Sequence, residues 1–209
     1  MTVRVIGRSV GGRPIEAITI GRGPTLALVH GGIHGDEPGA ALAVSRLARA
    51  LDPRGPRIVL VPAVNPDGLA ANTKDNARGV DLNRNFPATN FRVDHPAGYD
   101  PGAAPLSEPE SAALAALVEQ EGPRRIVAVH QPFACVNFDG PAGALAARMS
   151  AACGWPVVAD VGYPTPGSFS SRYGRDLGLE VITLELPRPA GDADHAAALA
   201  ALLVACRDE

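Results

Sequence analysis

Short apolar runs alternate with segments of helical periodicity along the chain. Predicted strands cover residues 25–30, 57–64, 125–130, 156–159 and 179–186, and predicted helices cover residues 38–51, 107–118, 141–152 and a closing segment from about 192. The helix at 107 follows Ser107-Glu108-Pro109-Glu110, which is typical of a capped start. Continuous apolar strands separated by helices predict an α/β fold: a single domain (1–209) with a mixed, mostly parallel twisted sheet and helices on both faces.

One long stretch breaks this alternation. Residues 65 to about 105 are polar and rich in Pro and Gly, and they form no clear strand or helix pattern. Connections of this length are uncommon in compact domains unless they carry function. We therefore expect functional side chains in this stretch.

Side chains able to bind metal follow the predicted strands. His34 and Glu37 lie three residues apart in a glycine-rich turn after the first strand, and His130 ends the strand at 125–130. Ligands of open α/β sheets bind beyond the carboxyl ends of the strands, so these side chains can converge. Two imidazoles and a carboxylate are a typical ligand set of a catalytic zinc, although a His-x-x-Glu spacing alone also occurs by chance.

Glu185 is a charged residue within an apolar run, Val181 to Leu186. A carboxylate in such a position is costly unless it is paired or used. It either forms a buried salt bridge with an arginine or acts as a general base that takes a proton from an attacking water.

Asn83 and Arg84 lie next to each other in the long polar stretch. A guanidinium binds a carboxylate in bidentate fashion, so this pair suits recognition of an acidic group on a ligand. A solvated surface loop has the same composition, and the pair alone does not decide between the two.

Six motifs occur in a fixed order: His34–Glu37 (His-Gly-Asp-Glu), Asn65–Gly68 (Asn-Pro-Asp-Gly), Gly79–Pro87, Ser107–Glu110, His130 and Thr183–Leu186. From about Thr25 to the C-terminus, the chain resembles the zinc metallocarboxypeptidases of the M14 type. Within this family it is most similar to the bacterial murein peptide amidases, which cleave the γ-D-glutamyl–diaminopimelate bond of cell-wall peptides. The segment Gly162–Phe169 supports that subgroup.

The resemblance implies roles for individual residues. His34, Glu37 and His130 would bind one zinc ion, and Glu185 would be the general base. Asn83 and Arg84 would hold the terminal carboxylate of the substrate.

The family usually places an arginine upstream of the Asn–Arg pair to stabilise the oxyanion. Lys74 occupies the best-aligned position here, and Arg78 is the alternative. Tyr163 either covers the bound substrate or is a packed loop aromatic.

The charge and the apolar pattern argue against nucleic acid and membrane as partners. The formal net charge is −3, which argues against nucleic acid, and no apolar stretch is long enough to span a membrane. The N-terminal residues have no pattern of a secretory signal, so a cytoplasmic protein is expected. The three cysteines lack the spacing of a disulfide framework, and the sequence does not indicate an oligomeric state.

Three functions compete. The first is a zinc-dependent amidase or carboxypeptidase acting on a small peptide with a free carboxylate. The second is an N-acyl amino acid deacylase similar to succinylglutamate desuccinylase and aspartoacylase, although Asn65–Gly68 and Ser107–Glu110 fit the peptidase better. The third, a metal-free binding module, is less consistent with a complete set of zinc ligands and Glu185.

Overall fold

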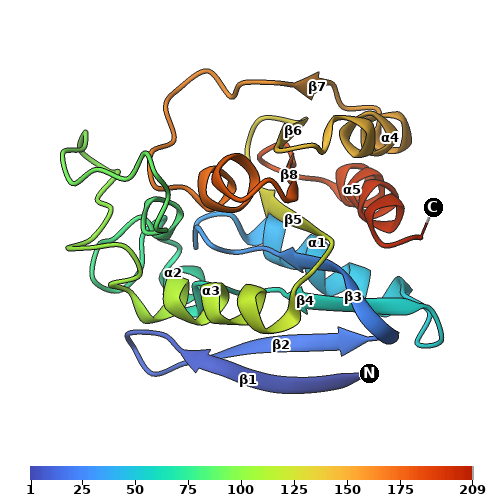
Figure 1. The fold of residues 1–209 in the computed structure, drawn as a ribbon, viewed down its shortest axis with the longest axis horizontal. Helices are drawn as coiled ribbons and strands as arrows, with labels where there is room; N and C mark the ends of the chain where they lie inside the picture. Colours follow the sequence, from blue (N-terminus) through green and yellow to red (C-terminus); the bar gives the residue numbers. More distant parts are fainter. Residues whose placement is uncertain (209) are drawn as a thin grey trace.

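The computed structural model describes residues 1–208 and contains one eight-stranded sheet with helices on both faces (Figure 1). The strands are β1 (Thr2–Arg8), β2 (Pro14–Ile20), β3 (Arg22–His30), β4 (Pro56–Val61), β5 (Arg125–His130), β6 (Cys135–Asp139), β7 (Val157–Val158) and β8 (Glu180–Glu185). The helices are α1 (Pro38–Ala50), α2 (Pro66–Ala71), α3 (Pro109–Glu121), α4 (Gly143–Cys153) and α5 (Asp192–Ala205). A 3₁₀ turn, η1 (Leu82–Arg84), and a π-helical segment, η2 (Ser171–Asp176), complete the elements.

The strand order is β1-β2-β4-β3-β5-β8-β6-β7. Strands β4, β3, β5 and β8 form a parallel centre, and antiparallel pairs join β1 to β2, β2 to β4 and β6 to β8. This arrangement confirms the predicted mixed, mostly parallel α/β fold. The parallel centre matters for function because it brings the carboxyl ends of β3, β5 and β8 to one edge of the sheet.

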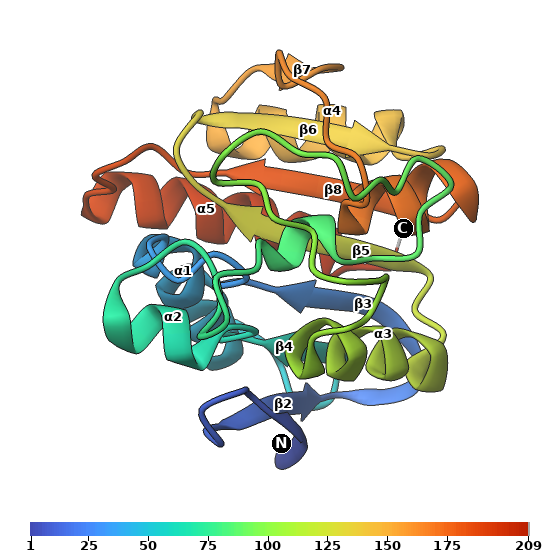
Figure 2. The same ribbon diagram turned by 90° about the vertical axis from the view of Figure 1, so that its left-hand side faces the viewer.

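Two apolar clusters lie on opposite faces of the sheet. Helices α1, α4 and α5 cover one face, and α3 with the segments around η1 and η2 covers the other. Figure 2 shows α3 in front of the sheet and α4 and α5 behind it. Side chains alternate between the two faces along each strand, so Val29 packs in the first cluster and Leu28 in the second.

The hydrophobic pattern located the parallel central strands and the short edge strand β7, but it missed three strands that form antiparallel pairs. Strands β1, β2 and β6 were not predicted, and the strand expected at 57–64 ends at Val61. Strand β1 alternates exposed and half-buried residues, so it lacks the continuous apolar run that marks β3 or β5. The capped start expected for α3 is also wrong, because its N-cap Glu108 makes no side-chain cap hydrogen bond.

The long polar stretch is ordered by hydrogen bonds more than by regular structure. It contains α2 and η1 and packs over the face that carries α3 (Figure 2). The fully buried Asn85 side chain donates to the carbonyls of Pro101 and Ala104 and accepts from the Glu108 amide and the Ser111 hydroxyl. These bonds fix the loop beside the start of α3 and so position Asn83 and Arg84.

Within residues 1–208, no helix is both long enough and apolar enough to cross a membrane.

Candidate metal centre and substrate cavity

The three residues expected to bind metal meet at the carboxyl edge of the sheet. His34 lies in the turn after β3, Glu37 precedes the first turn of α1, and His130 is the last residue of β5. One candidate ligand atom from each lies within 4.8 Å of the others. The Nδ1 atoms of His34 and His130 lie 2.8 and 3.1 Å from the two carboxylate oxygens of Glu37.

Glycine makes this turn possible. A Cβ atom on Gly35 would lie 1.9 Å from the carbonyl carbon of Gly68, so no other residue fits without moving the backbone. The turn is also held by the Gly35 amide, which donates to the Lys74 carbonyl at 3.1 Å. The turn after β3 therefore packs closely against the Asn65–Gly68 motif. This packing positions the turn that carries His34 beside Glu37.

The charges around this cluster favour a cation. Burial disfavours a charged His34, but the carboxylates of Glu37 and Asp81 outweigh it and raise the His34 pKa to about 10. Burial likewise opposes ionisation of Glu37, yet His34 and His130 lower its pKa to about 2. A metal ion that replaces the imidazole proton satisfies the same carboxylates.

Asp81 is a site residue that the sequence analysis did not identify. It is fully buried, its Oδ1 lies 3.1 Å from His34 Nε2, and its Oδ2 lies 2.6 Å from Lys74 Nζ. A carboxylate on the outer nitrogen of a ligand histidine fixes the tautomer and the ring orientation. In the sequence, Asp81 is a single aspartate two residues before Asn83. Sequence pattern alone does not distinguish it from an ordinary turn residue.

Glu185 is the last residue of β8 and is 6% exposed. Burial raises its pKa to about 6, and the nearby Glu37 carboxylate adds to the shift, whereas His130 opposes it. The sequence analysis also considered a buried salt bridge between Glu185 and an arginine. No such salt bridge is found within residues 1–208. A carboxylate with a pKa near neutrality can both accept and return a proton.

Asn83, Arg84 and Tyr163 line the same cavity as the metal cluster. Asn83 Oδ1 accepts a hydrogen bond from the Phe169 amide at 3.0 Å, which fixes its side chain. Arg84 is 4% exposed and its guanidinium carbon lies 5.2 Å from the centre of the Tyr99 ring. Tyr163 is 39% exposed, and its ring centre lies 6.4 Å from that of Tyr99 and 6.3 Å from that of Phe133, so covering the substrate and packing in the loop both stay predictions.

The two candidates for the oxyanion cation lie apart. Lys74 forms an ion pair with Asp81 and therefore connects to His34. Arg78 instead pairs with Glu108 at 3.3 Å, and neither cation lines the cavity. The structure thus brings Lys74, but not Arg78, next to the metal cluster.

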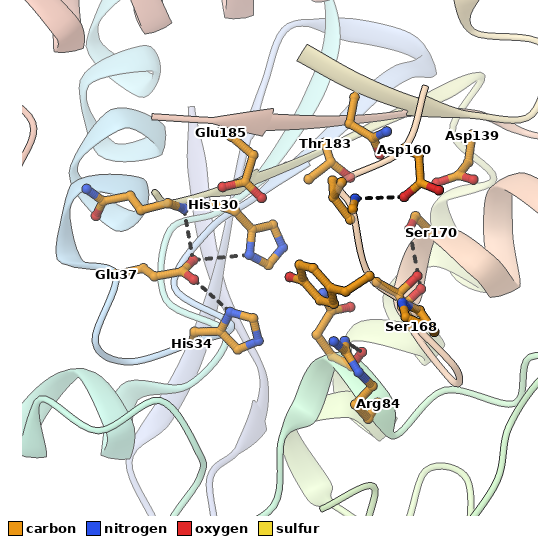
Figure 3. Close-up of a pocket in the computed structure, with 18 of the residues that line it drawn as sticks. His34, Glu37, Arg84, His130, Asp139, Asp160, Ser168, Ser170, Thr183 and Glu185 are labelled. Atoms are coloured by element: carbon orange, nitrogen blue, oxygen red, sulfur yellow. Dashed lines mark hydrogen bonds and ion pairs between the residues drawn. The ribbon is translucent and has the colours of Figure 1, made fainter. Parts of the chain in front are cut away.

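The cavity has a volume of about 330 Å³ and extends from the metal cluster toward strands β6 and β8. In Figure 3, His34, Glu37, His130 and Glu185 gather at one end, Arg84 lies below, and Asp139 and Asp160 lie at the other end. Two imidazoles and one carboxylate are a donor set that catalytic zinc uses, with a fourth position left for water or substrate. The residues present therefore fit a catalytic zinc.

Comparisons with known proteins identify the family of the chain. The zinc carboxypeptidase family profile matches residues 1–138. Murein peptide amidase A of Escherichia coli K12 is 38% identical over 201 residues, covering 89% of this chain and 81% of the relative. The Vibrio campbellii murein peptide amidase A is 34% identical over 205 residues, covering 89% and 79%.

A solved structure gives the same result for the fold. The crystal structure of murein-tripeptide amidase MpaA from Escherichia coli O157 superposes with a TM-score of 0.83 at 33% identity, covering 98% of this chain and 90% of that chain. The family match, these relatives and the shared fold lead to one conclusion. The chain belongs to the zinc carboxypeptidase family (M14) and is a hydrolase.

Proposed function

We propose that this chain is an amidase that cleaves the γ-D-glutamyl–diaminopimelate bond of murein-derived peptides. The observation that carries this proposal is the cavity itself, where a zinc-type ligand set and a buried carboxylate lie opposite an asparagine–arginine pair. The relatives that cover most of the chain are murein peptide amidases, which supports this substrate class. The coarser activity, zinc-dependent peptidase or amidase, follows from the family.

The proposed metal site holds one zinc ion bound by His34, Glu37 and His130. Zinc bound there supplies Lewis acidity, which polarises the scissile carbonyl and makes an attacking water more acidic. Asp81 orients His34 through the outer ring nitrogen, at 3.1 Å.

Glu185 is the proposed general base. Its carboxylate takes a proton from the water that attacks the carbonyl carbon. The same proton then passes to the leaving amine nitrogen as the carbon–nitrogen bond breaks, giving a carboxylic acid and an amine. A pKa raised to about 6 by burial suits both halves of this transfer.

Arg84 and Asn83 bind the free carboxylate next to the scissile bond in this proposal. The Arg84 side chain is held in place by its own hydrogen bond to the Asn83 carbonyl, at 2.7 Å. Lys74 is the proposed cation for the oxyanion, because its partner Asp81 contacts His34, whereas Arg78 pairs with Glu108. Tyr163, at the rim, covers the bound peptide.

The alternative activity, deacylation of N-acyl amino acids, is not favoured by these relatives. A small peptide is the proposed partner, and neither the charge of −3 nor the helices described indicate nucleic acid or membrane as a partner. A cytoplasmic location remains part of the proposal.

Release of diaminopimelate tests the proposal. The purified, zinc-loaded protein is incubated with L-Ala-γ-D-Glu-meso-diaminopimelate and, separately, with N-acetyl and N-succinyl amino acids, and the amines released are separated by chromatography. We expect a higher kcat/KM for the tripeptide than for any acyl amino acid. Faster cleavage of the acyl amino acids would support the deacylase instead.

A further inference from the structure

The floor of the cavity away from the metal cluster is formed by two antiparallel strands. Strands β6 and β8 pair Cys135 with Glu185, Asn137 with Thr183 and Asp139 with Val181. Opposed residues of an antiparallel pair point to the same face, and side chains alternate along each strand. Because Glu185 faces the cavity, Asn137, Thr183 and Asp139 face it too, and all three line it.

The far end of this floor carries charge of both signs. Asp139 is 7% exposed, and its Oδ1 lies 2.5 Å from Nε of Arg175, whose side chain is 56% exposed. Asp160 lies on the same side of the cavity, beyond Thr183 in Figure 3. Arg175 bonds Asp139 through Nε, which leaves its two terminal nitrogens to bind a ligand carboxylate.

The segment that carries Arg175 is a π-helix, η2, a rare conformation that is frequent at functional sites. It packs tightly on β6, since a Cβ atom on Gly174 would lie 2.4 Å from the Cβ of Asp139. This close approach places Arg175 beside Asp139 at the mouth of the cavity.

We propose that Asp139 and Arg175 recognise the outer end of the substrate side chain, a carbon that bears both an ammonium and a carboxylate. The ammonium binds Asp139, with Asp160 nearby, and the carboxylate binds the terminal nitrogens of Arg175. This inference rests on the proposed function and identifies the residues that select diaminopimelate over lysine.

The length of the floor matches this side chain. Along β6, Asp139 lies four residue steps from Cys135, which is opposite Glu185, a distance of about 13 Å at the usual rise per residue. In diaminopimelate, six bonds join the scissile nitrogen to the outer ammonium and span about 7 Å when extended. A hydrogen bond of about 3 Å at each end, to Glu185 and to Asp139, brings the total to about 13 Å, which equals the distance along the strand.

Lysine provides a matched test, because it equals diaminopimelate without the outer carboxylate. The kcat/KM is measured for L-Ala-γ-D-Glu-meso-diaminopimelate and for L-Ala-γ-D-Glu-L-Lys, with the wild type, Arg175→Gln, Asp139→Asn and Arg172→Gln. Arg172 is a control on the same π-helix that does not line the cavity. The wild type and Arg172→Gln are expected to prefer the diaminopimelate peptide by about 10-fold or more.

Arg175→Gln is expected to remove this preference by slowing cleavage of the diaminopimelate peptide alone. Unchanged cleavage of the lysine peptide then shows that the variant is folded. Asp139→Asn is expected to slow both peptides, since both carry the ammonium. Equal cleavage of the two peptides by the wild type, or an unchanged preference in Arg175→Gln, would overturn the inference and leave the proposed amidase activity intact.

Cleavage of neither peptide would instead contradict the proposed function. Calorimetric binding of free meso-diaminopimelate and of L-lysine to the wild type and Arg175→Gln then decides the inference independently of catalysis. A preference for meso-diaminopimelate that is lost in Arg175→Gln supports recognition by Arg175, and equal binding of the two amino acids overturns it.

Discussion

Glu185 unites two properties that rarely occur together in one carboxylate. It ends an apolar strand and is 6% exposed, yet it lines a cavity large enough to admit a substrate. The other carboxylate of the site, that of Glu37, instead lies between two imidazoles, those of His34 and His130. The surroundings of the two glutamates therefore suit their two proposed roles, a metal ligand that remains ionised and a base that exchanges a proton.

Replacing Glu185 with Gln is expected to lower kcat on the tripeptide by about 10²–10⁴-fold, because an amide cannot accept the proton of the attacking water. The fold and the metal content are expected to be unchanged, since Gln has nearly the same shape. The measurement is kcat together with zinc content and circular dichroism. Glu16→Gln, an exposed change on β2, serves as the control, and a near-normal kcat in Glu185→Gln would make Glu185 structural.

Sequence pattern was sufficient for some site residues and insufficient for others. His130 and Glu185 follow apolar strands directly, so their meeting at one sheet edge could be predicted from the strand pattern. Asp81 could not, because it lies in an irregular loop where spacing does not determine direction. Arg175 and Asp139 are 36 residues apart, and their contact depends on a π-helix that has no clear sequence pattern.

Among the strands, those whose side chains are buried on both faces of the sheet could be predicted from the sequence. All six residues of β5 are buried, so an apolar run marks it without ambiguity. Strand β6 has only five residues, two of which are Asn137 and Asp139, whose polar side chains face the cavity. The polar residues that line the cavity therefore interrupt the apolar pattern from which the strand could have been predicted.

The long stretch between β4 and α3 depends on Asn85 for its shape. Asn85→Ala is expected to lower the free energy of unfolding by about 1–3 kcal/mol, because it leaves the buried Pro101 carbonyl and the buried Glu108 amide without a partner. Urea denaturation measures this change, and Thr73→Ala, an exposed change in the same stretch, is the control.

The same variant is expected to raise KM for the tripeptide, because Arg84 immediately precedes Asn85 and loses its fixed position. If Asn85→Ala were as stable as the control, the stretch would be held by its apolar contacts, such as those of Phe86, and not by the Asn85 hydrogen bonds.

Across the whole molecule, the metal cluster joins parts of the chain that are distant in sequence. His34 follows β3, Glu37 precedes α1 and His130 ends β5, so a bound ion links the sheet to the helix layer. Without an ion, two imidazoles and two carboxylates remain buried together. The carboxylates then raise the pKa of His34, so that a proton on His34 takes the place of the ion. Zinc binding is therefore coupled to the stability of the fold as well as to catalysis.

Removing zinc with a chelator is expected to lower the melting temperature. A ligand at about 100 times its Kd stabilises the folded state by about 2.7 kcal/mol, and each kcal/mol shifts Tm by about 2–4 °C at this chain length. A loss of about 5–10 °C is expected, restored by one equivalent of zinc per chain. The His34→Ala, His130→Ala double variant is expected to show no response to zinc, since a single carboxylate does not hold the ion. Stoichiometric zinc in the double variant would place the metal elsewhere, and Glu185 would then have no role as the base beside it.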